Sequence, residues 1–116
     1  MKILLLDDDY GCIKAVYHLL RKVCKNCEIE MFTNPELCIE HYISSEMPDI
    51  IISDFRMPGI DGEQFIRTME FMGFEGKSFI VSGWSGLDPL ESHADGIFTK
   101  PVNAEDFRQV LAACHV

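Results

Sequence analysis

The sequence predicts a doubly wound α/β sandwich, in which helices cover both faces of a parallel sheet. Short apolar runs alternate with stretches of helical periodicity along the chain, the pattern of repeated strand-helix units. The run Lys2–Leu6 is almost continuously apolar, which is typical of a strand buried on both faces. The 116 residues, 47% of them hydrophobic, can fill one packed core, so we expect a single domain over residues 1–116.

The first half of the chain is expected to contain three strands and two helices. After the strand Lys2–Leu6, apolar residues recur at helical spacing from Ile13 through about residue 24. A second strand is expected at Glu28–Phe32. The stretch Asn34-Pro35-Glu36 then opens a helix, because a capping residue is followed by proline at the first helical position. The third strand, Asp49–Ser53, ends at Asp54.

The second half begins with a turn at 57–62, which leads into a helix through about Met72. Two further strands are expected at Ser78–Val81 and Gly96–Thr99, and Asn103 caps a last helix. Between those strands, Asp88-Pro89-Leu90-Glu91 combines a cap, a first-position proline and a capping-box glutamate. This predicts a shortened fourth helix of about six residues, which needs packing support to persist.

Charge and hydropathy exclude some functions. The formal net charge is −9, from 19 acidic and 10 basic residues, so direct nucleic-acid binding and attachment to an anionic membrane are not expected. No apolar stretch approaches the length of a signal-peptide core or a membrane span, and we expect a cytoplasmic protein. The five cysteines are expected to be reduced thiols, with a redox or zinc role for Cys24 and Cys27 as the alternative.

Polar residues follow four of the predicted strands. In a parallel sheet of this kind the working crevice lies beyond the carboxyl ends of the strands. Each polar residue alone is ordinarily a turn, cap or solvated surface residue, but together they predict a site. The residues are Asp7, Asp8 and Asp9 after the first strand, Asp54 after the third, Ser82 after the fourth and Lys100 after the fifth.

Chemical roles follow from these residue types. Clustered carboxylates repel one another unless a cation lies among them, and an oxygen-only set suits Mg²⁺, for which Asp7 and Asp8 are the candidate ligands. Asp54 is the candidate nucleophile toward a phosphoryl group. Lys100 and Ser82 can then reach phosphoryl oxygens, while Asp9 is expected to be solvated or to start a helix.

These residues identify a family. The chain resembles, over nearly its whole length, the chemotaxis-regulator-like receiver domains of two-component response regulators. The resemblance rests on Asp7-Asp8 after the first strand and on Asp54 within ISDFRMPGIDG. It also rests on Ser82-Gly83 after the fourth strand and Lys100-Pro101 after the fifth.

The resemblance implies a five-stranded flavodoxin-like sheet of order 2-1-3-4-5. It implies that Asp54 accepts a phosphoryl group from a histidine kinase or a histidine phosphotransfer protein, with Ser82 and Lys100 binding that group. Mg²⁺ would be held by Asp8, Asp54 and the backbone carbonyl of Arg56, with Asp7 acting mainly through water. Lys100 and Pro101 would be joined by a cis peptide. The family is regulatory, and its members catalyse only their own phosphoryl transfer and dephosphorylation.

The sequence also departs from the family pattern. The usual aromatic switch residue, three positions before the lysine, is Ile97 here. Phe98 should point to the other face of the sheet and so does not replace it. The segment from Ser82 to Lys100 is about one helical turn short, so the usual partner surface should be remodelled. Arg56 and Trp84 flank the site and are expected to tune the phosphoryl lifetime, unless Trp84 only packs against the short helix.

Three function classes follow. The first is a phosphorylation switch that changes the affinity for a downstream protein. The second is a binding module whose output does not depend on phosphate, which Ile97 makes conceivable. The third, a haloacid-dehalogenase-like phosphatase, fits least, because LLLDDDYG lacks the threonine of DxDxT and the chain has no room for a cap domain. The intact set of Asp8, Asp54, Ser82 and Lys100 favours the switch. With no output domain after the last helix, we expect a stand-alone regulator or a receiver from a longer protein.

Overall fold

The computed structural model describes residues 1–84 and 86–114. In this part of the chain, five parallel strands form one sheet of order β2-β1-β3-β4-β5, which confirms the predicted topology. Four helices accompany them. The strands are β1 Lys2–Leu6, β2 Glu28–Phe32, β3 Ile50–Asp54, β4 Lys77–Ser82 and β5 Gly96–Thr99. The helices are α1 Tyr10–Val23, α2 Pro35–Ile43, α3 Gly62–Phe71 and α4 Ala104–Cys114.

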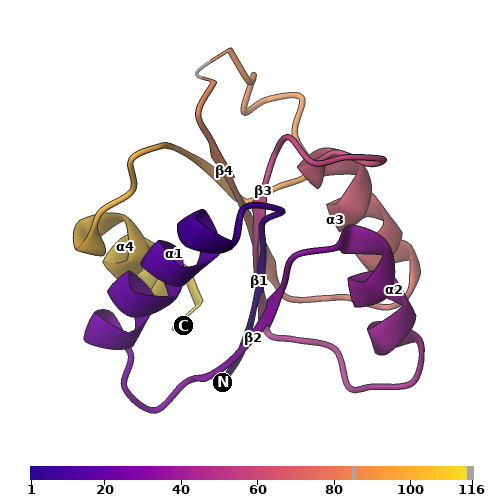
Figure 1. The fold of residues 1–116 in the computed structure, drawn as a ribbon, viewed down its shortest axis with the longest axis horizontal. Coiled ribbons are helices and arrows are strands. Elements are labelled where there is room, and N and C mark those ends of the chain that lie inside the picture. Colours follow the sequence, from indigo (N-terminus) through magenta and orange to yellow (C-terminus); the bar gives the residue numbers. More distant parts are fainter. Residues whose placement is uncertain (85, 115–116) are drawn as a thin grey trace.

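The sheet separates two halves of the hydrophobic core. Helices α1 and α4 cover one face, and α2 and α3 cover the other (Figure 1). Side chains of β1 alternate between the two halves, with Ile3 and Leu5 on the α1 side and Leu4 and Leu6 on the α3 side. This double burial explains the continuous apolar run of the first strand.

Helices α2 and α4 begin at the predicted capping residues. The Asn34 side chain accepts a hydrogen bond from the Leu37 amide, with proline at the first position of α2. Asn103 and Asp106 exchange side-chain and backbone hydrogen bonds at the start of α4. Asp9 caps α1, so the third aspartate of the N-terminal run is a helix-start residue.

The prediction of a short helix after Asp88 is wrong. Residues 86–95 form turns, of which one is closed by a 3.1 Å bond from the Glu91 amide to the Asp88 carbonyl. The Asp88 carboxylate does accept from the Leu90 amide, as a cap would. However, six residues give too few helical hydrogen bonds to offset nucleation, and Leu90, 95% exposed, supplies no packing.

The expectation of reduced thiols is also wrong for one pair. A disulfide joins Cys24 and Cys27, whose Cα atoms lie 5.7 Å apart where the chain turns from α1 into β2. Cys12, Cys38 and Cys114 are free. The Cα–Cα distance lies within the usual range for a disulfide.

None of the helices in residues 1–84 and 86–114 combines the length and the apolar character needed to cross a membrane.

Candidate functional site

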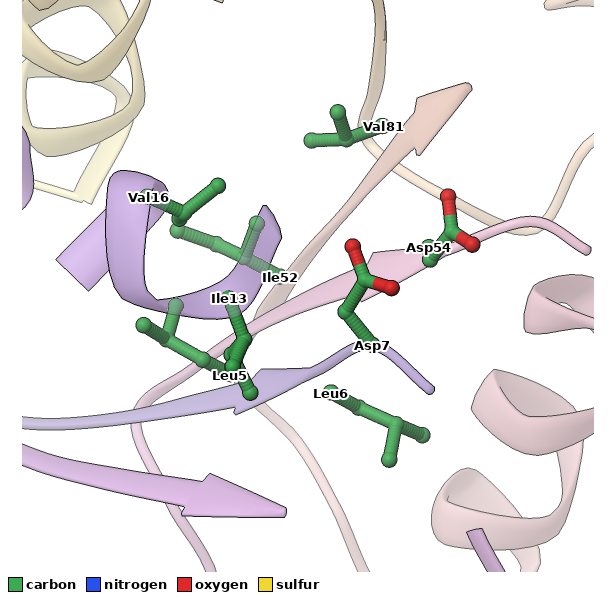
Figure 2. A pocket seen from close by; sticks show the side chains of 8 residues that line it. All are labelled: Leu5, Leu6, Asp7, Ile13, Val16, Ile52, Asp54 and Val81. Atoms are coloured by element: carbon green, nitrogen blue, oxygen red, sulfur yellow. The ribbon is translucent and has the colours of Figure 1, made fainter. Parts of the chain in front are cut away.

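The predicted polar residues meet at one edge of the sheet because the strands are parallel and in register. Leu6 pairs with Ser53, which places Asp7 beside Asp54 one residue further along. The side chains of Asp7 and Asp54 lie next to each other at the ends of β1 and β3 (Figure 2). On the other side of β3, the β4 strand ends at Ser82. Lys100 directly follows β5.

Three carboxylates form a cluster. Asp7, Asp8 and Asp54 each offer an oxygen within 4.8 Å of those of the other two. Asp7 is buried, Asp54 is partly buried and Asp8 is exposed, so the cluster is open to solvent on one side. An oxygen-only set of this size fits a hard cation such as Mg²⁺. The division into direct and water-mediated ligands, and the role of the Arg56 carbonyl, stay predictions.

One ammonium group binds two of these carboxylates. The Lys100 Nζ lies 3.0 Å from Asp54 Oδ1 and 3.3 Å from Asp7 Oδ2. Burial alone would lower the pKa of Lys100, but the hydrogen bond to Asp54 and the charge of Asp7 outweigh it, so its pKa is raised. The residue is held in place by its amide, which donates to the Ser82 carbonyl at 2.8 Å, and the Lys100-Pro101 peptide is cis as predicted.

Asp7 lies against apolar side chains at the base of the site. Leu5, Ile13 and Ile52 surround it on the side of α1 (Figure 2). Burial raises the pKa of Asp7, even though the Asp9 amide and Lys100 stabilise its charged form. The negative charge of Asp54 raises the same pKa further. The cluster therefore holds more negative charge than Lys100 compensates.

A tight loop follows Asp54. The Phe55 amide donates to the Val81 carbonyl, and the Gly62 amide donates to the Phe55 carbonyl at 2.7 Å. A Cβ at Gly62 would lie 2.5 Å from the Asp54 carbonyl oxygen, so only glycine permits this closure. The next helix, α3, starts there with Asp61 as its cap. The motif DFRMPGIDG thus forms the loop between Asp54, at the end of β3, and the start of α3, and hydrogen bonds hold both ends of this loop.

A cleft opens beside Asp54. It is lined by Asp54, Arg56, Ser82, Gly83, Trp84 and Lys100. The Ser82 hydroxyl accepts a hydrogen bond from the Trp84 amide at 3.0 Å. The Arg56 guanidinium lies 5.5 Å from the Trp84 ring, so this indole packs on the arginine and not on a helix. The alternative that Trp84 only supports a short fourth helix is therefore wrong.

The structure places Ile97 and Phe98 on opposite faces, as predicted. Ile97 packs with the α2 and α3 half of the core, and Phe98 packs on the other half, 6.0 Å from the ring of Phe79. Phe98 is therefore turned away from the face on which Ile97 lies and does not take its place.

Sequence reasoning did not find Glu63. Its carboxylate accepts hydrogen bonds from the Ser92 hydroxyl at 2.6 Å and from the His93 amide. It thereby ties to α3 the segment between β4 and β5, whose described residues are 83, 84 and 86–95 and which we call the β4–β5 segment. A first-turn glutamate is ordinarily read as a helix-dipole contact, and nothing local to Glu63 indicates partners about thirty residues away.

Comparison with known proteins agrees with this geometry. Residues 3–112 match the family model of the response regulator receiver domain. The chain is 27% identical to sporulation initiation phosphotransferase F of Bacillus subtilis, over 95% of this chain and 90% of that protein. It is 30% identical to the transcriptional regulatory protein FlgR of Helicobacter pylori, over 90% of this chain but only 27% of that longer protein.

The fold is shared with solved structures. The response regulator protein TrrA of Thermotoga maritima, crystallised in complex with Mg²⁺-BeF, superposes with a TM-score of 0.83 over 97% of each chain, at 22% identity. At that identity the likeness shows the fold, and the family assignment rests on the family model. The chain therefore belongs to the receiver domains of response regulators, which are regulatory domains of two-component systems and not conventional enzymes.

Proposed function

We propose that this chain is a phosphoacceptor switch, in which Asp54 takes a phosphoryl group from a histidine kinase or a phosphotransfer protein in a Mg²⁺-dependent reaction. The observation that carries the proposal is the Lys100 ammonium 3.0 Å from Asp54, beside a cluster of three carboxylates. This is the arrangement that a phosphoryl group on Asp54 requires, because its oxygens need cationic partners.

The proposed transfer forms one bond to phosphorus and breaks another, while Lys100 and Ser82 contact the phosphoryl oxygens. A carboxylate oxygen of Asp54 forms a bond to phosphorus, and the bond from phosphorus to the donor nitrogen or oxygen breaks with its electron pair. Lys100 then exchanges its contact with Asp54 for a phosphoryl oxygen, while it can keep its contact with Asp7. The Ser82 hydroxyl lines the same cleft and can donate a hydrogen bond to a second phosphoryl oxygen.

Asp7, Asp8 and Asp54, with the backbone carbonyl of Arg56, would hold the Mg²⁺ ion. When bound, this ion supplies positive charge to the oxygens of the transferring group. Asp7 and Asp8 would in turn orient it beside the nucleophile. The three carboxylates lie close together, and Lys100 supplies one positive charge against their three negative charges. This imbalance supports the assignment.

The test is phosphorylation by a small donor. The chain is incubated with acetyl phosphate in the presence of Mg²⁺ or of EDTA, and its intact mass is measured. We expect one phosphoryl adduct with Mg²⁺ and none in Asp54→Ala. Asp88→Asn, an exposed aspartate outside the site, is the matched control and should keep the adduct. An unmodified wild-type chain would overturn the proposal.

A second candidate is a binding module whose output does not depend on phosphate. Ile97 favours it, because the aromatic side chain that would sense the site is missing. Amide spectra of the β4–β5 segment with and without the adduct separate the two candidates. Chemical shifts that change from Ser82 to Ile97 favour the switch, and unchanged shifts in a phosphorylated chain favour the module.

A further inference from the structure

A groove lies between the start of α3 and the β4–β5 segment, on the α3 side of the sheet. In Figure 1 that segment rises above the sheet after β4 and returns beside the upper end of α3. The groove has a volume of about 220 Å³, which is room for one long side chain and not for a cofactor. It is lined by Phe55, Asp61, Glu63, Ile80, Leu87, Asp88, Glu91, Ser92 and Ile97.

The wall of this groove is fixed by hydrogen bonds. Glu63 binds the Ser92 hydroxyl and the His93 amide, as described above, and the His93 ring lies 3.3 Å from the Glu70 carboxylate. These contacts hold the β4–β5 segment to α3 although it forms no helix in its described residues. The groove therefore exists before any phosphoryl group is added.

The floor of the groove is apolar and the rim is acidic. Ile80 and Ile97, neighbours across β4 and β5, form the floor with Phe55 and Leu87. The rim carries the carboxylates of Asp61, Glu63, Asp88 and Glu91, and no lysine or arginine is among the described lining residues.

The fold uses these carboxylates to different extents. Glu63 holds the β4–β5 segment with both oxygens, whereas Asp61 uses one oxygen to cap α3. The Glu91 carboxylate forms no hydrogen bond or ion pair within residues 1–84 and 86–114. Asp88 uses one oxygen for the Leu90 amide and keeps the other available. The free negative charge thus sits at the edge where the apolar floor meets solvent.

We propose that this groove binds an arginine or lysine side chain of a partner protein, within a segment that also carries apolar residues. A long basic side chain matches both surfaces, because its methylene stem can cover Ile97 and Ile80 while its charged head reaches Asp88 and Glu91. Charge complementarity selects this occupant, since an acidic segment would meet four carboxylates.

The inference does not depend on the proposed phosphorylation, because the groove is present in the unmodified chain. The probe is a short blocked peptide in which arginine alternates with leucine. It is titrated into the full chain without Mg²⁺ or phosphodonor, and amide chemical shifts are followed. The control peptide carries glutamate in place of each arginine. We expect the largest shifts at Leu87, Glu91 and Ile97 with the basic peptide, and none with the acidic one.

Variants test whether the rim charges are responsible. The double variant Asp88→Asn with Glu91→Gln should weaken binding of the basic peptide by about fivefold, as expected for the loss of two exposed charge pairs. Glu40→Gln with Glu75→Gln removes the same charge from exposed positions elsewhere and should leave binding unchanged. Equal weakening by both pairs, shifts centred away from the groove, or binding of the acidic peptide would overturn the proposal. Both double variants should still accept phosphate from acetyl phosphate, so failure of the groove and failure of the switch are distinguishable.

Discussion

Asp7 is the most deeply buried charged residue of the site. Its side chain is 7% exposed, whereas that of Lys100, its cationic partner, is 28% exposed. Burial and the neighbouring charge of Asp54 both disfavour the charged form, which raises the pKa of Asp7. A buried carboxylate with a raised pKa reduces stability when it is ionised at neutral pH. When it is ionised, Asp7 therefore lowers the stability of the fold.

Asp7→Asn should stabilise the chain in the absence of Mg²⁺. Removing the buried charge relieves its desolvation and its repulsion from Asp54, so we expect the free energy of unfolding to rise by about 1 kcal/mol, the usual size of a single-substitution effect. Urea unfolding at neutral pH with EDTA measures it. The exposed neighbour is the control, since Asp8→Asn should change the free energy of unfolding little. An Asp7→Asn chain less stable than wild type would show that the Lys100 pair outweighs these costs.

We predict that Trp84 affects how long a phosphoryl group on Asp54 would last. The indole is 47% exposed, rests on Arg56 and lines the cleft that opens on Asp54. An attacking water must pass this cleft, so we predict that Trp84→Ala shortens the half-life of the aspartyl phosphate by a few-fold to about tenfold. Decay of the intact-mass adduct after removal of the donor measures it. Trp84→Phe should retain most of the wild-type lifetime, and a half-life unchanged in Trp84→Ala would contradict the prediction.

At the scale of elements, the β4–β5 segment is where the structure departs from the predicted strand-helix alternation. It replaces the expected helix with turns, and Glu63 of α3 holds it through hydrogen bonds, beside the partly buried side chains of Leu87 and Ala94. Segments of this kind open at a lower free energy than the sheet they join. The strand ends it connects carry Ser82 and Ile97, so its movement can link the site to the groove.

Glu63→Ala should release this segment. Without the carboxylate, the Ser92 hydroxyl and the His93 amide lose their acceptor, and amide exchange at His93 should accelerate by about tenfold. Exchange at β4, in Lys77–Ser82, should not change. Glu63→Gln retains an acceptor and serves as the matched control. Equal exchange at His93 in both variants and in wild type would mean that Glu63 does not hold the segment.

At the scale of the whole molecule, Glu30 ties the edge strand β2 to its neighbours. Its carboxylate accepts from the Tyr42 hydroxyl of α2, lies 3.0 Å from Lys2 Nζ of β1 and lies 3.5 Å from His41 Nε2. Burial would raise the pKa of Glu30, but the hydrogen bonds from Tyr42 and Lys2 outweigh it and lower the pKa below its ordinary 4.5.

This contact should make part of the stability acid-sensitive. Because the folded-state pKa of Glu30 is lowered, its contribution is present above the unfolded-state value and is lost as pH falls through the folded-state value. Glu30→Gln should therefore lose about 1 kcal/mol at neutral pH and show a smaller further loss toward about pH 3 than wild type. Urea unfolding across this range measures it, with the exposed Glu28→Gln as control. Parallel pH profiles of wild type and Glu30→Gln would refute the assignment.

Much of the fold can be read from short-range patterns. The bounds of β1, β2 and β5 are those predicted, and Asn34 and Asn103 start their helices, because the apolar run of a strand and the cap of a helix are set within a few residues. The site positions follow from the same logic, since a parallel sheet brings its strand ends to one edge.

The errors concern longer-range contacts. The Asp88-Pro89-Leu90-Glu91 stretch has the local signals of a helix start, yet the segment satisfies its polar groups through Glu63, which lies 29 residues before Ser92. The contact of Trp84 with Arg56 joins two loops. Neither of these contacts is indicated by spacing or propensity alone. The Cys24–Cys27 disulfide is a local exception, because the two residues are three positions apart, but this spacing does not distinguish a disulfide from two free thiols.

The central claim is that Asp54, and no other carboxylate of the cluster, accepts the phosphoryl group. It is tested most directly by locating the modification. The chain is treated with acetyl phosphate and Mg²⁺ and then with borohydride, which reduces an aspartyl phosphate to homoserine, and its peptides are sequenced by mass spectrometry. We predict homoserine in place of Asp54 alone, and none when EDTA replaces Mg²⁺. Reduction at Asp7 or Asp8, a phosphate on Ser82, or no modified peptide would contradict the account.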